Sequence, residues 1–107
     1  MNKCLLIGLE YGGIDSARIE VEAGLGIALA AHESSYRGGD YYRTEVGDAD
    51  VILQINFVDD DGQRAEPDFQ THDLLLYLDG DAGDVDRLES KLSVSGCPVT
   101  VLRRSTY

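Results

Sequence analysis

Lysine and arginine are scarce in this chain. They account for nine of its 107 residues, whereas 20 residues are aspartate or glutamate, and the formal net charge at pH 7 is −11. A surface of that sign repels the phosphate backbone of nucleic acids and anionic lipid headgroups. The charge balance therefore argues against a nucleic-acid partner and against attachment to an anionic membrane.

Cysteine is also scarce, and long apolar runs are missing. Cys4 and Cys97 are the two cysteines, and neither belongs to a Cys-x-x-Cys motif or a Cys/His ligand cluster. They do not make the disulfide framework of a small secreted domain, so we expect reduced, buried thiols. The first residues lack the features of a signal peptide, and no apolar run approaches the ~20 residues of a membrane span. We therefore expect a soluble, cytoplasmic protein.

Motifs for catalysis and for cofactor binding are missing as well. No serine lies in a Gly-x-Ser-x-Gly turn, and no glycine cluster forms a Walker loop or a dinucleotide fingerprint. The residues 79–84 only partly match a calcium loop, because Gly83 stands where an oxygen donor is needed and Ser90 where a glutamate is needed. His32 and His72, the only histidines, would act as an acid and base only if folding brought them together. We expect no enzyme activity, no cofactor and no metal site.

The spacing of apolar residues predicts two helices. In the first, Ile14, Ala17, Val21 and Leu25 follow helical steps of three and four, although the alternation from Ile19 to Leu25 would also fit a strand. The start signals favour the helix, with Asp15 or Ser16 capping its first turn and Gly24 with Gly26 ending it. The other follows residue 84 and turns Val85, Leu88 and Leu92 inward, with acidic residues at its start and Gly96 and Pro98 marking its end.

Short apolar or β-branched runs predict the strands. Because 43% of the residues are hydrophobic, a usual value for a globular protein, we expect one packed domain over residues 1–107. The expected strands cover 4–9, 27–31, 41–46, 51–57, 74–78 and 99–102, with turns or loops at 34–40 and 79–84 and a surface excursion at 59–68.

The order of these segments predicts an α+β fold. Two strand-helix-strand units flank a central meander, which resembles the split βαβ sandwich of ferredoxin-like proteins. We expect a mostly antiparallel sheet with both helices on one face and the other face open for binding.

Half of the acidic residues lie between residues 59 and 86, where ten acids face a single base, Arg64. The local net charge is thus −9, whereas the chain from Arg87 onward is net +3. Such a field attracts a basic partner and speeds its association. Aromatic residues interleaved with the acids would supply buried contact area. The candidate partner-binding residues are Tyr36, Asp40, Tyr42, Asp59, Asp60, Asp61, Glu66, Asp68 and Phe69.

Three segments carry a family resemblance. Residues 32–43 (His-Glu-Ser-Ser-Tyr-Arg-Gly-Gly-Asp-Tyr-Tyr-Arg), 51–54 (Val-Ile-Leu-Gln) and 59–69, with Asp-Asp-Asp-Gly and Glu-Pro-Asp-Phe, resemble small bacterial immunity proteins. Such proteins are encoded beside polymorphic or contact-dependent growth inhibition toxins. The resemblance implies a cytoplasmic antidote that binds one cognate toxin domain, commonly a basic nuclease, and blocks its active site or nucleic-acid cleft. It transfers no catalytic residues.

Two alternatives remain open from the sequence. A pair of strand-helix-strand units can also form a small-molecule-sensing regulatory domain that acts as a dimer. A metal-assisted enzyme would use the three aspartates at 59–61 together with His72.

Overall fold

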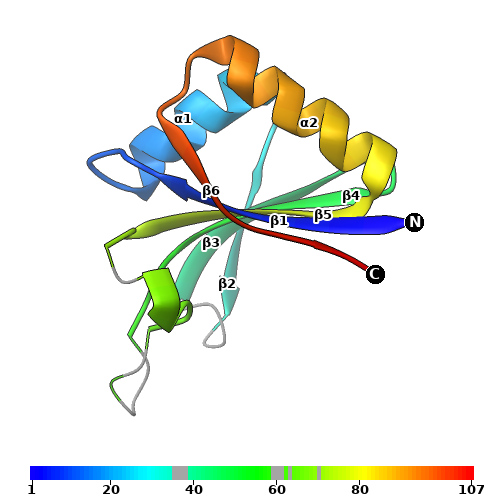
Figure 1. Cartoon of the computed structure of the whole chain (residues 1–107). Coiled ribbons are helices and arrows are strands. Elements are labelled where there is room, and N and C mark those ends of the chain that lie inside the picture. The colour runs from blue at the N-terminus through cyan, green and yellow to red at the C-terminus, as the bar shows by residue number, and fades with distance from the viewer. Residues whose placement is uncertain (35–38, 59–61, 63, 70) are drawn as a thin grey trace.

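The computed structural model describes residues 1–34, 39–58, 62, 64–69 and 71–107. This part of the chain forms an α+β structure with one open six-stranded sheet and two helices (Figure 1). Every pair of neighbouring strands is antiparallel, and the strand order is β2-β3-β4-β5-β1-β6. The α+β class and the antiparallel sheet are therefore confirmed. The elements are β1 (Asn2–Leu9), α1 (Ile14–Leu25), β2 (Ala30–Ser34), β3 (Gly39–Val46), β4 (Ala49–Ile55), the 3-10 turn η2 (Pro67–Phe69), β5 (Leu74–Asp81), α2 (Ala82–Ser95) and β6 (Val99–Thr106).

The main core lies between the helices and the central strands. Successive residues of a strand point to opposite faces of a sheet, and alternate residues of β1, β4 and β5 share one buried cluster with the inner residues of both helices. Figure 1 shows α1 and α2 side by side against the sheet. The members of this cluster are Leu5, Ile7, Leu9, Ala17, Val21, Leu25, Leu29, Ala49, Val51, Leu53, Leu74, Leu76, Leu78, Val85, Leu88 and Leu92.

Helix α1 forms where the apolar spacing predicted a helix, but it has a different N-terminal cap. Its cap residue is Gly13, which makes no side-chain hydrogen bond to the first turn. The carboxylate of Asp15 instead accepts a hydrogen bond from the Tyr42 hydroxyl at 2.8 Å. The expected capping by Asp15 or Ser16 was therefore wrong, whereas Gly26 ends the helix in a left-handed conformation with φ 67°, as predicted.

Helix α2 begins directly after β5, without the loop that we expected at 79–84. Asp79 and Gly80 continue the strand because they pair with β1 on one side and with β4 on the other. The Asp81 carboxylate then accepts a hydrogen bond from the Asp84 amide at 3.1 Å and caps the helix. The predicted inner face of Val85, Leu88 and Leu92 is buried, and Gly96 ends the helix.

Strand β2 starts later than predicted. Residues 27–29 are not in a strand, and the Leu29 amide donates to the Glu22 carboxylate at 2.8 Å. These residues therefore connect the end of α1 to the edge strand of the sheet. The loop expected at 34–40 does not include Ser34, which belongs to β2, or Gly39 and Asp40, which belong to β3. Residues 35–38 lie outside the described residues.

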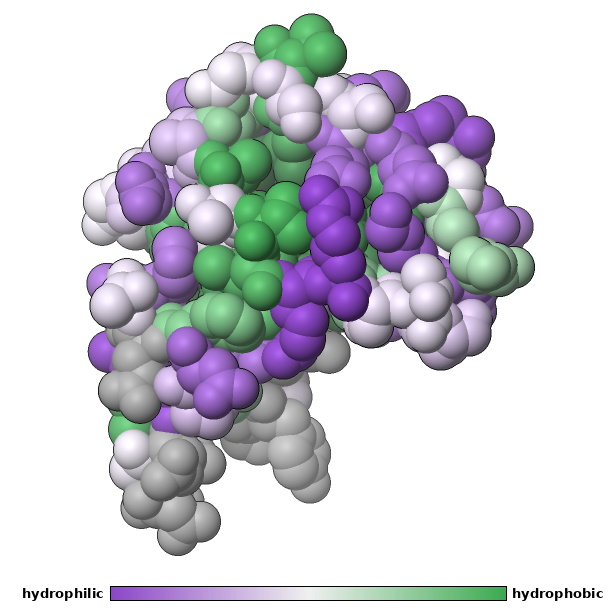
Figure 2. Space-filling view, in the orientation of Figure 1, coloured by the Kyte–Doolittle hydropathy of each residue, from purple (hydrophilic) through white to green (hydrophobic). Residues whose placement is uncertain are grey.

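Apolar residues are also buried on the sheet face opposite the main core. Leu6 and Leu75 are 1% and 0% exposed, although neither belongs to the main cluster. On the face seen in Figure 2, apolar side chains gather over the start of β6 and are bordered by a hydrophilic band. The second face of the sheet is thus not a bare polar surface.

A close backbone contact requires glycine at position 80. Gly80 has φ 148°, and a Cβ there would lie 2.1 Å from the carbonyl oxygen of Asp48. We expect Gly80→Ala to lower the free energy of unfolding by about 3 kcal/mol, because both the backbone conformation and the contact would be strained. Urea denaturation measures this change.

Gly12→Ala is the matched control. A Cβ at Gly12 meets no atom within 4 Å, and its φ is not positive. We expect its unfolding free energy to stay within about 0.5 kcal/mol of the wild type. Equal denaturation midpoints for the two variants would contradict the explanation given for Gly80.

Candidate functional site

The residues between β4 and β5, numbers 56–73, form the segment that we call the connecting segment. It contains six of the predicted partner-binding residues, of which Glu66, Asp68 and Phe69 lie in its described part, whereas Asp59, Asp60 and Asp61 do not. Its described part includes the 3-10 turn η2 and an isolated bridge between Val58 and Arg64. The connecting segment is therefore an ordered excursion at these positions rather than a tight hairpin, as the sequence indicated.

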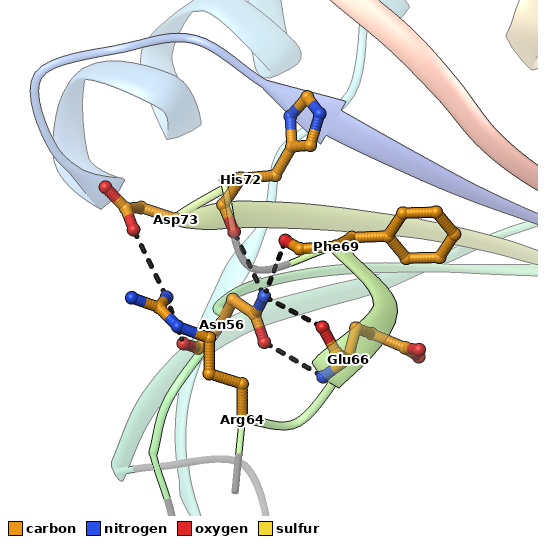
Figure 3. Close-up of polar contacts among 6 residues, drawn as sticks. All are labelled: Asn56, Arg64, Glu66, Phe69, His72 and Asp73. Carbon is orange, nitrogen blue, oxygen red and sulfur yellow. Dashed lines mark hydrogen bonds and ion pairs between the residues drawn. The ribbon is translucent and has the colours of Figure 1, made fainter.

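Asn56 holds the connecting segment together (Figure 3). It is only 4% exposed, and its Nδ2 lies within hydrogen-bonding distance of the carbonyl oxygens of Glu66, Phe69 and His72, at 3.3, 3.2 and 3.1 Å. Its Oδ1 accepts from the Glu66 amide at 2.9 Å. One buried side chain thus satisfies backbone groups from three places in the segment, which would otherwise be costly to bury.

The two ends of the connecting segment are tied to each other. The backbone N–H of Asn56 donates to the backbone carbonyl of Asp73 at 2.7 Å. The guanidinium of Arg64 donates both to the Asn56 carbonyl and to the Asp73 carboxylate, each at 3.3 Å. Arg64 is therefore occupied within the segment and does not lie free among the acids.

Glu66 fastens the connecting segment to the sheet. Its carboxylate accepts a hydrogen bond from the Tyr77 hydroxyl at 2.8 Å and two from the Arg103 guanidinium at 3.1 and 3.2 Å. The pKa of Arg103 is raised, chiefly by this hydrogen bonding. The Glu66 side chain is 14% exposed. The structure thus places this predicted partner-binding residue in contacts within its own chain.

His72 packs against β1 at a position where only glycine leaves space. A Cβ on Gly8 would lie 2.4 Å from the His72 Nδ1. His32 lies in β2 and stacks on Tyr41 at 5.4 Å between ring centroids. Three strands separate β2 from β1 in the sheet, roughly 19 Å at the usual strand spacing. The two histidines therefore do not form an acid-base pair.

The other predicted partner-binding residues differ in their availability. Asp40 in β3 and Asp68 in η2 are exposed, and Phe69 is half-buried. The Tyr42 hydroxyl bonds to Asp15, which raises the pKa of Tyr42, and its ring lies 4.7 Å beneath the guanidinium carbon of Arg18. Tyr42 therefore joins β3 to α1. Tyr36, Asp59, Asp60 and Asp61 lie outside the described residues.

Three strands align acidic residues that the sequence did not bring together. Glu45 is opposite Asp50, and Asp50 is opposite Asp79. Like charges in these positions destabilise a sheet. Arg43 offsets the repulsion by pairing with Asp50 at 3.0 Å, and the Tyr107 hydroxyl donates to Asp79. This hydrogen bond, followed by desolvation, raises the pKa of Tyr107 to about 12.

Ion pairs within the chain use almost every described base. Seven of the eight bases in the described residues pair with a carboxylate, and Lys91 is the exception. Ten of the 17 carboxylates in the same residues have no ion-pair partner there. The excess negative charge is therefore left at the surface and is not cancelled by folding. These ten are Glu10, Asp15, Glu20, Glu33, Asp40, Glu45, Asp48, Asp68, Asp79 and Asp81.

The described residues contain no group of three histidine, cysteine, aspartate or glutamate side chains that could hold a metal ion. Cys4 and Cys97 are free thiols, and both are half-buried instead of fully buried as expected. Burial raises the pKa of Cys4. None of the helices in the described part of the chain has the length and apolar character needed to cross a membrane.

Loss of the Asn56 side chain should destabilise the protein. Asn56→Ala leaves several buried backbone groups without partners, so we expect the free energy of unfolding to fall by about 3 kcal/mol. Asn56→Asp keeps the shape but places a second oxygen against three carbonyls, and we expect a loss at least as large. Urea denaturation measures both changes.

Asn2→Ala is the control for the Asn56 variants, because Asn2 is the only other asparagine and is exposed. We expect its unfolding free energy to stay within about 0.5 kcal/mol of the wild type. If Asn56→Ala were equally mild, the hydrogen bonds of Asn56 would not be what holds the connecting segment.

Asn56 was not among the residues that the sequence singled out. A lone polar residue after the apolar run of β4 is a weak signal, because its partners lie at 66, 69 and 72 and become visible only after folding. A scan against protein-family models finds no match for this chain, and a search of curated proteins finds none either. The function must therefore be inferred from the chain's own residues and their geometry.

Proposed function

We propose that this chain is a binding protein of the immunity type, which captures and neutralises a basic bacterial toxin domain. The observation that carries this proposal is the unequal pairing of charge. Ten described carboxylates lack an ion-pair partner among the described residues, whereas the described bases other than Lys91 are already paired. Such a surface attracts cations and cannot offer a matching cationic surface to an anion.

The inhibition would work by substitution of charge. A nuclease binds the phosphates of its substrate through arginine and lysine, and carboxylates can accept the same hydrogen bonds. Asp40 and Asp68 are exposed and free of ion pairs within the described residues. We propose that they and the aspartates at 59–61 enter the nucleic-acid cleft of the toxin, with Phe69 adding apolar contact. The protein itself would perform no reaction and would act in the cytoplasm.

A rigid connecting segment would support tight binding. Side chains held in place before association lose less conformational entropy when they bind. Asn56 and the contact between Glu66 and Arg103 hold the described part of this segment against the sheet. In this proposal Glu66 positions its neighbours, while Asp68 makes the contact with the partner.

The strand order also fits a ferredoxin-like interpretation of the fold. The strands β6, β1, β5 and β4 are neighbours in that order, and the helices follow β1 and β5. We propose that these elements form a split βαβ sandwich with both helices on one face, extended at one edge by the β2–β3 hairpin.

Charge neutralisation provides the test of the proposed function. The partner to be used is the toxin domain encoded by the reading frame beside this chain's gene. Replacement of the three aspartates at 59–61 by asparagine should slow association by about tenfold at low salt and flatten its salt dependence, because steering by charge acts mainly on the association rate. Surface plasmon resonance over a salt series measures both rates.

A control variant neutralises three helix carboxylates, those of Asp15, Glu20 and Asp86, and so changes the net charge equally. We expect it to slow association less than the variant at 59–61. Equal association rates for the wild type and the variant at 59–61 at every salt concentration would refute the role of these aspartates. Failure of the wild type to bind the toxin domain or to protect cells from it would refute the proposed function.

A second candidate function is supported by a groove between the helices. Residues from the C-terminal halves of α1 and α2 line an apolar groove of about 550 Å³, which is within the usual size range of small-molecule sites. A small-molecule-sensing regulatory domain would use it. This candidate would be favoured if amino acids or nucleotides raised the melting temperature of the protein and the toxin domain did not. The groove residues are Ala23, Gly24, Leu25, Gly26, Ser90, Lys91, Val94 and Ser95.

A further inference from the structure

The two edges of the sheet differ in how they are protected. An edge strand exposes unpaired backbone groups, and proteins commonly guard it with bulges, prolines or charged residues. Strand β6 has these features: its register with β1 shifts between Leu6 and Ile7, Pro98 precedes it, and it carries Arg103 and Arg104. This edge is therefore unsuited to pairing with another strand.

Strand β2, at the other edge, has no bulge and no proline, and its one charged residue is Glu33. It pairs with β3 without a register shift from Ala30 opposite Arg43 to Ser34 opposite Gly39. It contains no proline, lysine or arginine, and four of its five residues are exposed. Five residues are an ordinary strand length. In the described residues β2 has β3 as its one neighbour, so the outer backbone groups of Ala30–Glu33 face no other described strand and can bond an added one.

The charges beside this edge indicate what kind of strand would fit. Glu33 in β2 lies directly opposite Asp40 in β3, and neither carboxylate has an ion-pair partner among the described residues. Like charges opposite each other destabilise a sheet. A lysine or arginine in the next strand, in the same row, would turn this repulsion into attraction.

The other face of the hairpin carries a complementary feature. The rings of His32 and Tyr41 are stacked with an interplanar angle of 22°, and these residues are opposite each other in the register. Aromatic and β-branched side chains pack well beside such a pair in the neighbouring strand. A strand with a base on one face and an apolar side chain on the other would therefore match both rows.

We infer that the β2 edge receives an extended strand from the basic partner, which joins the sheet as a seventh strand. A base of that strand aligns with Glu33 and Asp40, and an aromatic or β-branched residue aligns with His32 and Tyr41. Backbone hydrogen bonds supply affinity in this mode of recognition, and the side-chain rows supply selectivity. The basic character of the partner rests on the proposed function. A second copy of this chain fits less well, because each copy carries a net charge of −11 and the two would repel each other.

A synthetic peptide tests this inference without the toxin. The probe is a short peptide in which lysine and valine alternate, titrated into the full-length, isotope-labelled protein and followed by NMR. We expect the backbone amide shifts of Ala30–Ser34 to change, with those of β6 unaffected. A peptide with glutamate in place of lysine is the control, and it should bind about fivefold more weakly, because one exposed ion pair contributes up to about 1 kcal/mol.

A charge exchange separates recognition from damage to the fold. In the double variant Glu33→Lys with Asp40→Lys, the preference should invert, so that the glutamate peptide binds more tightly than the lysine peptide. An inverted peptide preference requires that the β2 edge is still folded, because a variant that has lost its structure would bind neither peptide.

Three outcomes would overturn the inference: no shift changes in β2, the same preference in the double variant, or self-association of the unliganded wild type through β2 in sedimentation experiments. The last would assign the edge to a second copy. Since the toxin is not used, these failures leave the proposed function standing. Conversely, peptide binding at β2 combined with no toxin binding would remove the proposed function alone.

Discussion

The buried amide of Asn56 is the interaction on which the arrangement of the connecting segment depends. A polar side chain that is 4% exposed must find partners in the protein, and Asn56 finds them in backbone groups of Glu66, Phe69 and His72. Two of these residues also contact the sheet through their side chains. Glu66 accepts hydrogen bonds from Tyr77 and Arg103, and the His72 ring lies against Gly8. A single side chain therefore connects the shape of the segment to its attachment on the sheet.

Negative charge is the second constraint on this protein, and it opposes stability. Like charges face each other between β2 and β3 and again across β3, β4 and β5. The intrachain ion pairs are mostly exposed, and such pairs contribute about 0 to 1 kcal/mol each. The large apolar core carries the stability instead. A chain that keeps unfavourable surface charge is well suited to a partner that brings the opposite charge.

The proposed interactions use two different parts of the molecule, the connecting segment and one edge of the sheet. The connecting segment presents Asp68 to solvent, and the β2–β3 hairpin presents Glu33 and Asp40. A basic partner could be steered by the first set of charges and held by backbone pairing at the second. The second set depends on antiparallel pairing, because direct cross-strand opposition places Glu33 and Asp40 in one row.

Local patterns in the sequence were sufficient for much of the fold. Apolar spacing predicted the presence of α1 and the inner face of α2, and Gly26 and Gly96 marked the helix ends. These signals act between residues a few positions apart. Among the candidate site residues, the sequence could identify Asp40 and Asp68 as acids, but not whether they were paired.

Only the tertiary structure decided the remaining features, because their partners are distant in the sequence. The sequence predicted a loop at Asp79 and Gly80, but both residues pair with β1 and with β4 and therefore belong to β5. The sequence predicted that Glu66 is available to a partner, whereas in the folded chain its carboxylate accepts hydrogen bonds from Arg103. The sequence by itself determined composition, charge and helical periodicity; strand pairing determined which charges are neutralised and which remain exposed.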